Sequence, residues 1–188
     1  VRRSAVYGMS ATTEPHRCVE AGLSDEVSAV RLASIEMIGE SHLLLSEAQR
    51  ATVTKRLHAL VKDRTQSNQL REQTMQTLGK MGACGAARSA LRVYLQSGGL
   101  KSLLFASIGA LQRCNSLDPF IPQLLENDND QVVLLGIRAA FERGEDTACP
   151  MLKTLKSGFI GRRQPQIQDL LNRCAHQAPG KTETNTSK

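Results

Sequence analysis

The stretch that decides the fold of this chain reads Val30-Arg31-Leu32-Ala33-Ser34-Ile35-Glu36-Met37-Ile38. Its apolar residues Val30, Ile35 and Ile38 follow helical spacing. The small residues Ala33 and Ser34 permit a neighbouring helix to approach closely. The stretch therefore predicts a helix that packs through one face.

Related stretches recur along the chain and begin at Val1, Leu70, Leu103 and Val133. Successive copies, counted from Val1, start 29, 40, 33 and 30 residues apart. Repeats of this length are typical of a solenoid, in which each unit buries its apolar face against its neighbours. We expect an all-α solenoid of about five repeated helical units with a C-terminal capping helix.

The repeated stretches supply one helix of each pair, here called the A helices. The partner helices, called the B helices, are predicted at residues 14–22, 47–62, 85–96, 119–126 and 149–157. Ser46 followed by Gln49 resembles a capping box at the start of the second B helix. A last helix at 164–175 is expected to cap a repeat domain spanning 1–175, and 176–188 reads as a flexible polar tail. No segment shows the sustained alternation of a strand, so we expect essentially no sheet.

Composition favours a soluble helical protein over a compact enzyme. Aromatic residues make up 3% of the 188, and there is no Trp, so aliphatic side chains must fill the core. No run approaches the roughly 18 consecutive apolar residues of a membrane span. The formal charge of +6 and the pI of about 9.3 allow an acidic partner, nucleic acid or an anionic surface, and equally fit simple surface charge.

Cysteine usage predicts a reducing compartment, and we place the protein in the cytoplasm. The chain has an odd number of widely separated cysteines without a Cys-x-x-Cys pair: Cys18, Cys84, Cys114, Cys149 and Cys174. We expect them to act as small core residues and not as a disulfide framework. Because Val1 already lies inside a repeat, we expect the chain to be a piece of a longer protein or to have lost its first residues.

The repeat pattern resembles the HEAT and HEAT-like repeat family over roughly residues 1–157. The resemblance is carried by Leu23, Asp25, Val30, Arg31, Ala33, Ile35, Ile38 and Gly39, and again by residues 139–146 with Pro150 and Leu152. It implies a right-handed superhelical solenoid of about five antiparallel helix pairs, in which the B helices line a concave face that binds protein or nucleic acid. Two copies depart from the pattern, since Leu104 and Leu134 stand where the others have Arg.

Arg2, Arg31 and Arg71 occupy equivalent repeat positions. The resemblance implies that they pair with loop acids such as Asp25 and tie neighbouring units together. The alternative is a basic stripe along the solenoid.

The B helices offer a better candidate binding site. A selection of their basic residues lies opposite the apolar positions and forms the candidate binding face: Arg17, Lys55, His58, Lys62, Arg92, Lys153 and Lys156. Such a surface predicts a protein partner of acidic character. Nucleic acid is the weaker alternative, because no aromatic residues interleave for base stacking.

No motif indicates catalysis, a metal or a cofactor. The histidines form neither a His-x-x-x-His pair nor the His-Glu dipeptides on which HEAT-like di-iron hydroxylases depend, and no phosphate-binding loop is present. We therefore expect a non-enzymatic scaffold or adaptor. The alternatives are a HEAT-like enzyme of the chromophore lyase or DNA glycosylase type, a nucleic-acid-binding solenoid, and a structural spacer within a larger chain.

Overall fold

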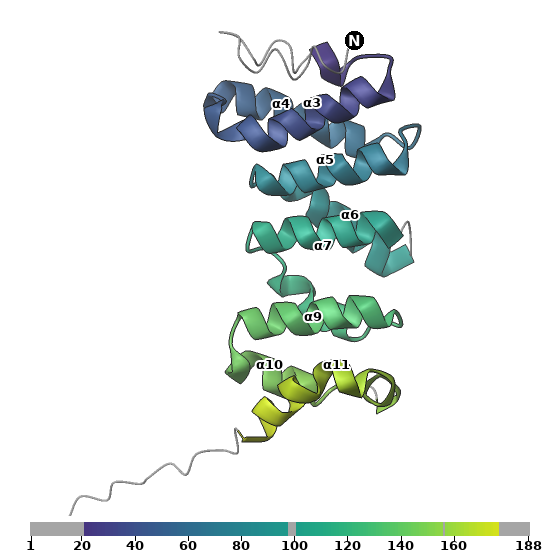
Figure 1. The fold of residues 1–188 in the computed structure, drawn as a ribbon, viewed down its shortest axis with the longest axis vertical. Coiled ribbons are helices and arrows are strands. Elements are labelled where there is room, and N and C mark those ends of the chain that lie inside the picture. Colours follow the sequence, from purple (N-terminus) through teal and green to yellow (C-terminus); the bar gives the residue numbers. More distant parts are fainter. Residues whose placement is uncertain (1–20, 98–100, 156, 177–188) are drawn as a thin grey trace, which may run out of the picture. The chain divides into compact units, whose positions relative to one another are not determined.

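The computed structural model describes residues 21–97, 101–155 and 157–176, and all the regular structure in these ranges is helical (Figure 1). The chain divides into two compact units, Val1–Leu117 and Asp118–Lys188. The first repeat stretch, Arg2, Arg17, Cys18, Lys156 and the predicted tail from residue 177 lie outside the described residues.

The first unit alternates the predicted A and B helices. In chain order it contains α3 (Ser28–Ser41), the 3-10 turn η2 (His42–Leu44), α4 (Glu47–Lys62), α5 (Asn68–Lys80), α6 (Gly85–Ser97) and α7 (Lys101–Arg113). The A helices α3, α5 and α7 lie side by side in that order, while α4 packs on α5, and α6 packs on α7 and α5 (Figure 1). The three repeat stretches in this unit are therefore helices that pack on one another, as predicted.

The A helices meet through the small and apolar residues of the repeat. Ile35 and Ile38 of α3, Leu78 of α5 and Ile108 of α7 are fully buried. The Thr77 hydroxyl is also fully buried and donates to the carbonyl oxygen of Ile35 at 3.2 Å, which links α5 to α3. Because this hydrogen bond satisfies the hydroxyl, a polar residue is tolerated in the core.

Helix α4 begins where the sequence predicted. The Ser46 hydroxyl accepts from the Gln49 backbone N–H, and the Gln49 side chain accepts from the Ser46 N–H. This capping box satisfies two donors that the first turn leaves free. Within η2, which connects α3 to α4, Leu43 and Leu44 are 76% and 81% exposed.

The second unit contains η3 (Asp118–Phe120), α8 (Ile121–Leu125), α9 (Asp130–Glu142), α10 (Glu145–Leu152) and α11 (Ser157–His176). Helix α9 packs on α8 and α10, and α10 packs on α11. The predicted A helix at 133–141 is thus confirmed within α9.

The bounds of two helices in this unit were predicted wrongly. Helix α10 starts four residues before the predicted Cys149 and ends at Leu152. The early start follows from Gly144, whose φ of 113° is not helical, and from acidic Glu145 in the first turn. Helix α11 starts at Ser157 and runs through Pro165, whereas the predicted helix began near that proline. Buried Phe159 anchors the additional turns at its start.

The cysteine prediction was also wrong. Cys84 is bonded to Cys114, and Cys149 to Cys174, with Cα–Cα distances of 6.3 and 5.3 Å. The partners are 30 and 25 residues apart in sequence, and the helical hairpins that separate them bring their ends together. With these disulfides the argument for a reducing compartment loses its basis, and a cytoplasmic location stays a prediction.

Within the described ranges no helix is both long and apolar enough to cross a membrane.

Candidate binding surface on α4 and α6

Helices α4 and α6 present an excess of positive charge to solvent. We call this the basic surface, and it consists of five exposed side chains: Lys55, Arg56, Lys62, Arg88 and Arg92. Glu47, in the first turn of α4, is the one acidic residue in the sequence of these two helices. An exposed surface of a single sign attracts anionic groups and raises their local concentration.

The helical repeat places these cations opposite the core. On α4, Val53 and Leu57 are fully buried, so Lys55 and Lys62 project toward solvent. On α6, fully buried Leu91 and the small buried Ala87 face the A helices. The exposed side of α6 therefore carries arginines one turn apart.

His58 had been predicted to belong to the exposed surface. Instead, it lies between α4 and α6. Its side chain is half-buried, and its Cε1 lies 3.7 Å from the position that a Cβ on Gly85 would occupy. His58 thus lies against Gly85 in the first turn of α6, and Gly85 precedes Arg88 by three residues. Its Nε2 is buried and has no hydrogen-bond partner among the described residues. The contact places the C-terminal half of α4 beside the first turn of α6.

The other predicted binding residues are not all part of this surface. Arg92 is exposed on α6, as expected, while Lys153 is exposed at the end of α10 and belongs to the second unit. Arg56 and Arg88 were not selected from the sequence, although Arg88 precedes Arg92 by one helical turn. That i, i+4 spacing is the signal that identifies it.

The arginines of the repeat bind backbone carbonyls. The Arg31 Nη1 donates to the carbonyl oxygens of Asp25 and Glu26, at 2.6 and 2.9 Å, and so fixes the loop before α3. The Arg71 Nε donates to the carbonyl oxygen of Val61 at 2.9 Å, which ties α5 to the end of α4. Both side chains are half-buried, so these contacts support a structural role and not a basic stripe. The Asp25 carboxylate accepts from the backbone N–H of Val27 at 2.8 Å.

An open hollow of about 310 Å³ adjoins α4. It is lined by Leu23, Ser24, Arg56, Ala59, Leu60 and Asp63. Hydrogen bonds from Gln66 and Thr65 stabilise the ionised carboxylate and lower the pKa of Asp63 to about 2. The hollow therefore contains the Arg56 cation and the Asp63 carboxylate, which is ionised at neutral pH. Because the carboxylate repels anions, an anion binds less favourably here than on the exposed faces of α4 and α6.

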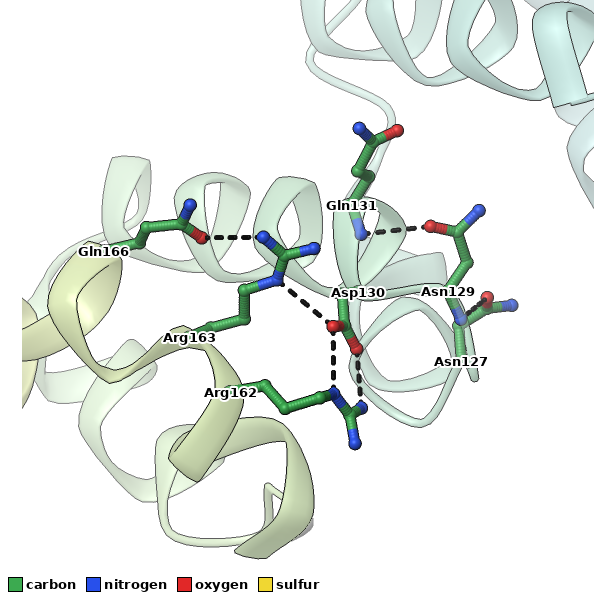
Figure 2. A network of polar contacts seen from close by, with 7 residues as sticks. All are labelled: Asn127, Asn129, Asp130, Gln131, Arg162, Arg163 and Gln166. Atoms are coloured by element: carbon green, nitrogen blue, oxygen red, sulfur yellow. Dashed lines mark hydrogen bonds and ion pairs between the residues drawn. The ribbon is translucent and has the colours of Figure 1, made fainter.

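A second polar cluster lies at the start of α9. Asp130 accepts two hydrogen bonds from Arg162, at 2.8 and 3.2 Å, and one from Arg163 at 3.1 Å (Figure 2). Hydrogen bonding to Arg162, followed by Arg163, lowers the pKa of Asp130, and the pKa of Arg162 is raised in return. Because both guanidinium groups are engaged with Asp130, the cluster holds the start of α11 against α9, and we assign it a structural role.

Among the described residues, no group of three or more His, Cys, Asp or Glu side chains is placed to hold a metal ion. No family model matches the chain, and comparisons with curated proteins and with solved structures find no match. The function must therefore be argued from the surface itself.

Proposed function

We propose that this chain is a HEAT-like helical repeat module that binds an acidic segment of a protein partner, without catalysing a reaction, as a scaffold or adaptor. The observation that carries the proposal is the basic surface. The two helices α4 and α6 carry five exposed cations, and their sequence contains one acidic residue.

The packing of the first unit supports the repeat part of the proposal. Each A helix contacts the next A helix, and the B helices α4 and α6 both pack on α5. Contacts between successive A helices support a stack of helical repeats. This packing leaves one face of each B helix free of core contacts, which is where ligands of repeat proteins bind.

The charges support an acidic segment as the ligand. Lysine and arginine side chains on separate turns suit an extended chain of carboxylates, since each pair formed at the rim of an interface steers association and adds about 0.2–1 kcal/mol. The aromatic platforms typical of single-stranded nucleic acid sites are missing from the basic surface as defined, so phosphate binding would rest on charge alone.

The test is a titration of the full chain with a fluorescent peptide rich in Glu and Asp, followed by anisotropy at low and moderate salt. We expect the variant with Lys55→Glu, Lys62→Glu and Arg92→Glu to bind about tenfold more weakly or worse. Unaltered helicity by circular dichroism confirms that the variant is folded.

The matched control reverses three exposed cations on the A helices, Lys80, Lys101 and Arg113, and so makes the same change in net charge. We expect this control to keep most of the affinity. Equal losses in the two variants would show that net charge and not the basic surface governs binding. Tighter binding of a DNA oligonucleotide than of the peptide would favour the nucleic-acid alternative.

A further inference from the structure

The two disulfides have the same topology, and each includes a cysteine at the C-terminal end of a helix, but only the first also includes a cysteine at a helix N-terminus. Cys84 precedes α6 and Cys114 follows α7, so their bond closes the open end of the α6–α7 hairpin. Cys149 lies in α10 and Cys174 in the last turn of α11, and their bond closes the α10–α11 hairpin. The chain thus offers an internal comparison between two cross-links of similar loop length.

Cys84 occupies the N-cap of α6. Its carbonyl oxygen accepts from the backbone N–H of Arg88 at 3.0 Å, the first hydrogen bond of the helix. The free N–H groups and the positive end of the helix dipole stabilise a thiolate at this place. Arg88 itself, one turn into α6, adds a positive charge on the same side.

The second disulfide has the opposite surroundings. Cys174 lies at the negative end of the α11 dipole, and Glu145 and Asp146 precede Cys149 by about one turn of α10. Arg173, beside Cys174, forms an ion pair with Glu145, which offsets its charge. A thiolate released at either cysteine is therefore less stable than one at Cys84.

Access decides which sulfur of the first pair is attacked. Cys84 is 7% exposed, and its Sγ lies 3.1 Å from the carbonyl oxygen of Ala110. Cys114 is half-buried at the end of α7, next to exposed Arg113. Because Cys114 is the more exposed residue of the pair, we take its Sγ as the site of attack and Cys84 as the leaving group. Burial and the Ala110 carbonyl oppose the charge on Cys84, while the helix N-terminus and Arg88 favour it.

We propose that the Cys84–Cys114 disulfide is a site of reversible thiol–disulfide exchange with a dithiol reductant, whereas Cys149–Cys174 is a lasting structural cross-link. A thiolate of the dithiol attacks the Sγ of Cys114, the Cys84–Cys114 bond breaks, and the electron pair stays on the Sγ of Cys84. The second thiol of the reductant then attacks the mixed disulfide and releases Cys114. The dithiol becomes a disulfide, and its two protons end on the two cysteines.

Reduction loosens the part of α6 that borders the basic surface. The buried apolar side chains of α6 near its start are Ala86, Ala87 and Leu91, which give a small contact area. Cutting the bond at Cys84 frees the first turn of α6, which carries Arg88. If the basic surface binds as proposed above, exchange at Cys114 regulates that binding, but the exchange itself does not depend on it.

The experiment uses the oxidised full chain with Cys18→Ser, so that both disulfides compete in one molecule. Reduced dithiothreitol is added at neutral pH, samples are quenched with acid over time, and free thiols are alkylated and assigned by mass spectrometry. We expect Cys84 and Cys114 to become labelled roughly tenfold faster than Cys149 and Cys174. Equal rates, or faster opening of Cys149–Cys174, overturn the proposal.

A second measurement tests the direction of attack. Brief treatment with glutathione, followed by acid quenching, traps the mixed disulfide. We expect glutathione on Cys114 and a free thiol on Cys84, and glutathione on Cys84 would refute the assigned leaving group. Full circular dichroism at the time of trapping confirms that exchange occurs in the folded chain, whereas labelling only after loss of helicity also overturns the proposal.

Discussion

The contact between α5 and α7 depends on a glycine, and replacing Gly79 with alanine tests the packing of the A helices directly. A Cβ at position 79 would lie 2.7 Å from the Cα and 2.8 Å from the Cβ of Ala110. Favourable contact between carbon atoms needs about 3.5–4.0 Å. Because the obstacle at Ala110 includes backbone, no side-chain rotation relieves it, and α5 and α7 must move apart by about an ångström.

The expected cost follows from two opposing effects. Forcing extra atoms into a well-packed core costs about 1–3 kcal/mol. Alanine gains up to about 1 kcal/mol over glycine within a helix, and less at Gly79 because it is the second-last residue of α5. We therefore expect Gly79→Ala to lower the free energy of unfolding by about 1–2 kcal/mol.

Gly109 on α7 provides the matched control. A Cβ there would contact only the Nη1 of Arg113, at 3.9 Å, so Gly109→Ala should gain about 0.5–1 kcal/mol from helix propensity. Urea unfolding followed by circular dichroism at 222 nm measures both variants, and hydrogen exchange in α5 and α7 locates the change. A Gly79→Ala variant stabilised as much as Gly109→Ala would refute the close approach of these helices.

Two further predictions concern the capping box and the loop after α4. Ser46→Ala removes the acceptor for the Gln49 N–H and should lower the unfolding free energy by about 1 kcal/mol in urea denaturation, and an unchanged midpoint would contradict the cap. Asp63 accepts from Thr65 and Gln66, and its folded pKa of about 2 lies below the unfolded value near 3.9. Its contribution to stability is therefore present above about pH 4 and is lost as the pH falls toward 2. The Tm difference between wild type and Asp63→Asn should be clear at pH 6 and vanish near pH 2, and a difference that persists in acid would refute this.

Local chemistry made much of the first unit predictable. Helix α4 starts after Ser46 and ends at Lys62, as predicted, because its cap and its apolar period are both encoded by neighbouring residues. The exposure of Lys55, Lys62 and Arg92 follows from the same helical period. Arg88 could have been recognised from its i, i+4 spacing to Arg92, whereas Arg56 required the burial pattern of the folded helices.

Of the two mispredicted helices, α11 is determined by residues distant in the chain, whereas α10 is not. Gly144 and Glu145 begin α10 locally, but α11 continues through Pro165 since Phe159 and the ion pairs to Asp130 hold its first turns in place. A proline signal alone cannot reveal contacts made with another helix.

The sequence by itself determined the all-helical character, the alternation of A and B helices, and the sign of the charge on α4 and α6, because helical period and capping are properties of neighbouring residues. Only the tertiary structure decided that His58 lies against α6 and that Cys84 pairs with Cys114. Both depend on how two helices meet, and spacing along the chain does not specify which cysteines or helix ends come within bonding distance.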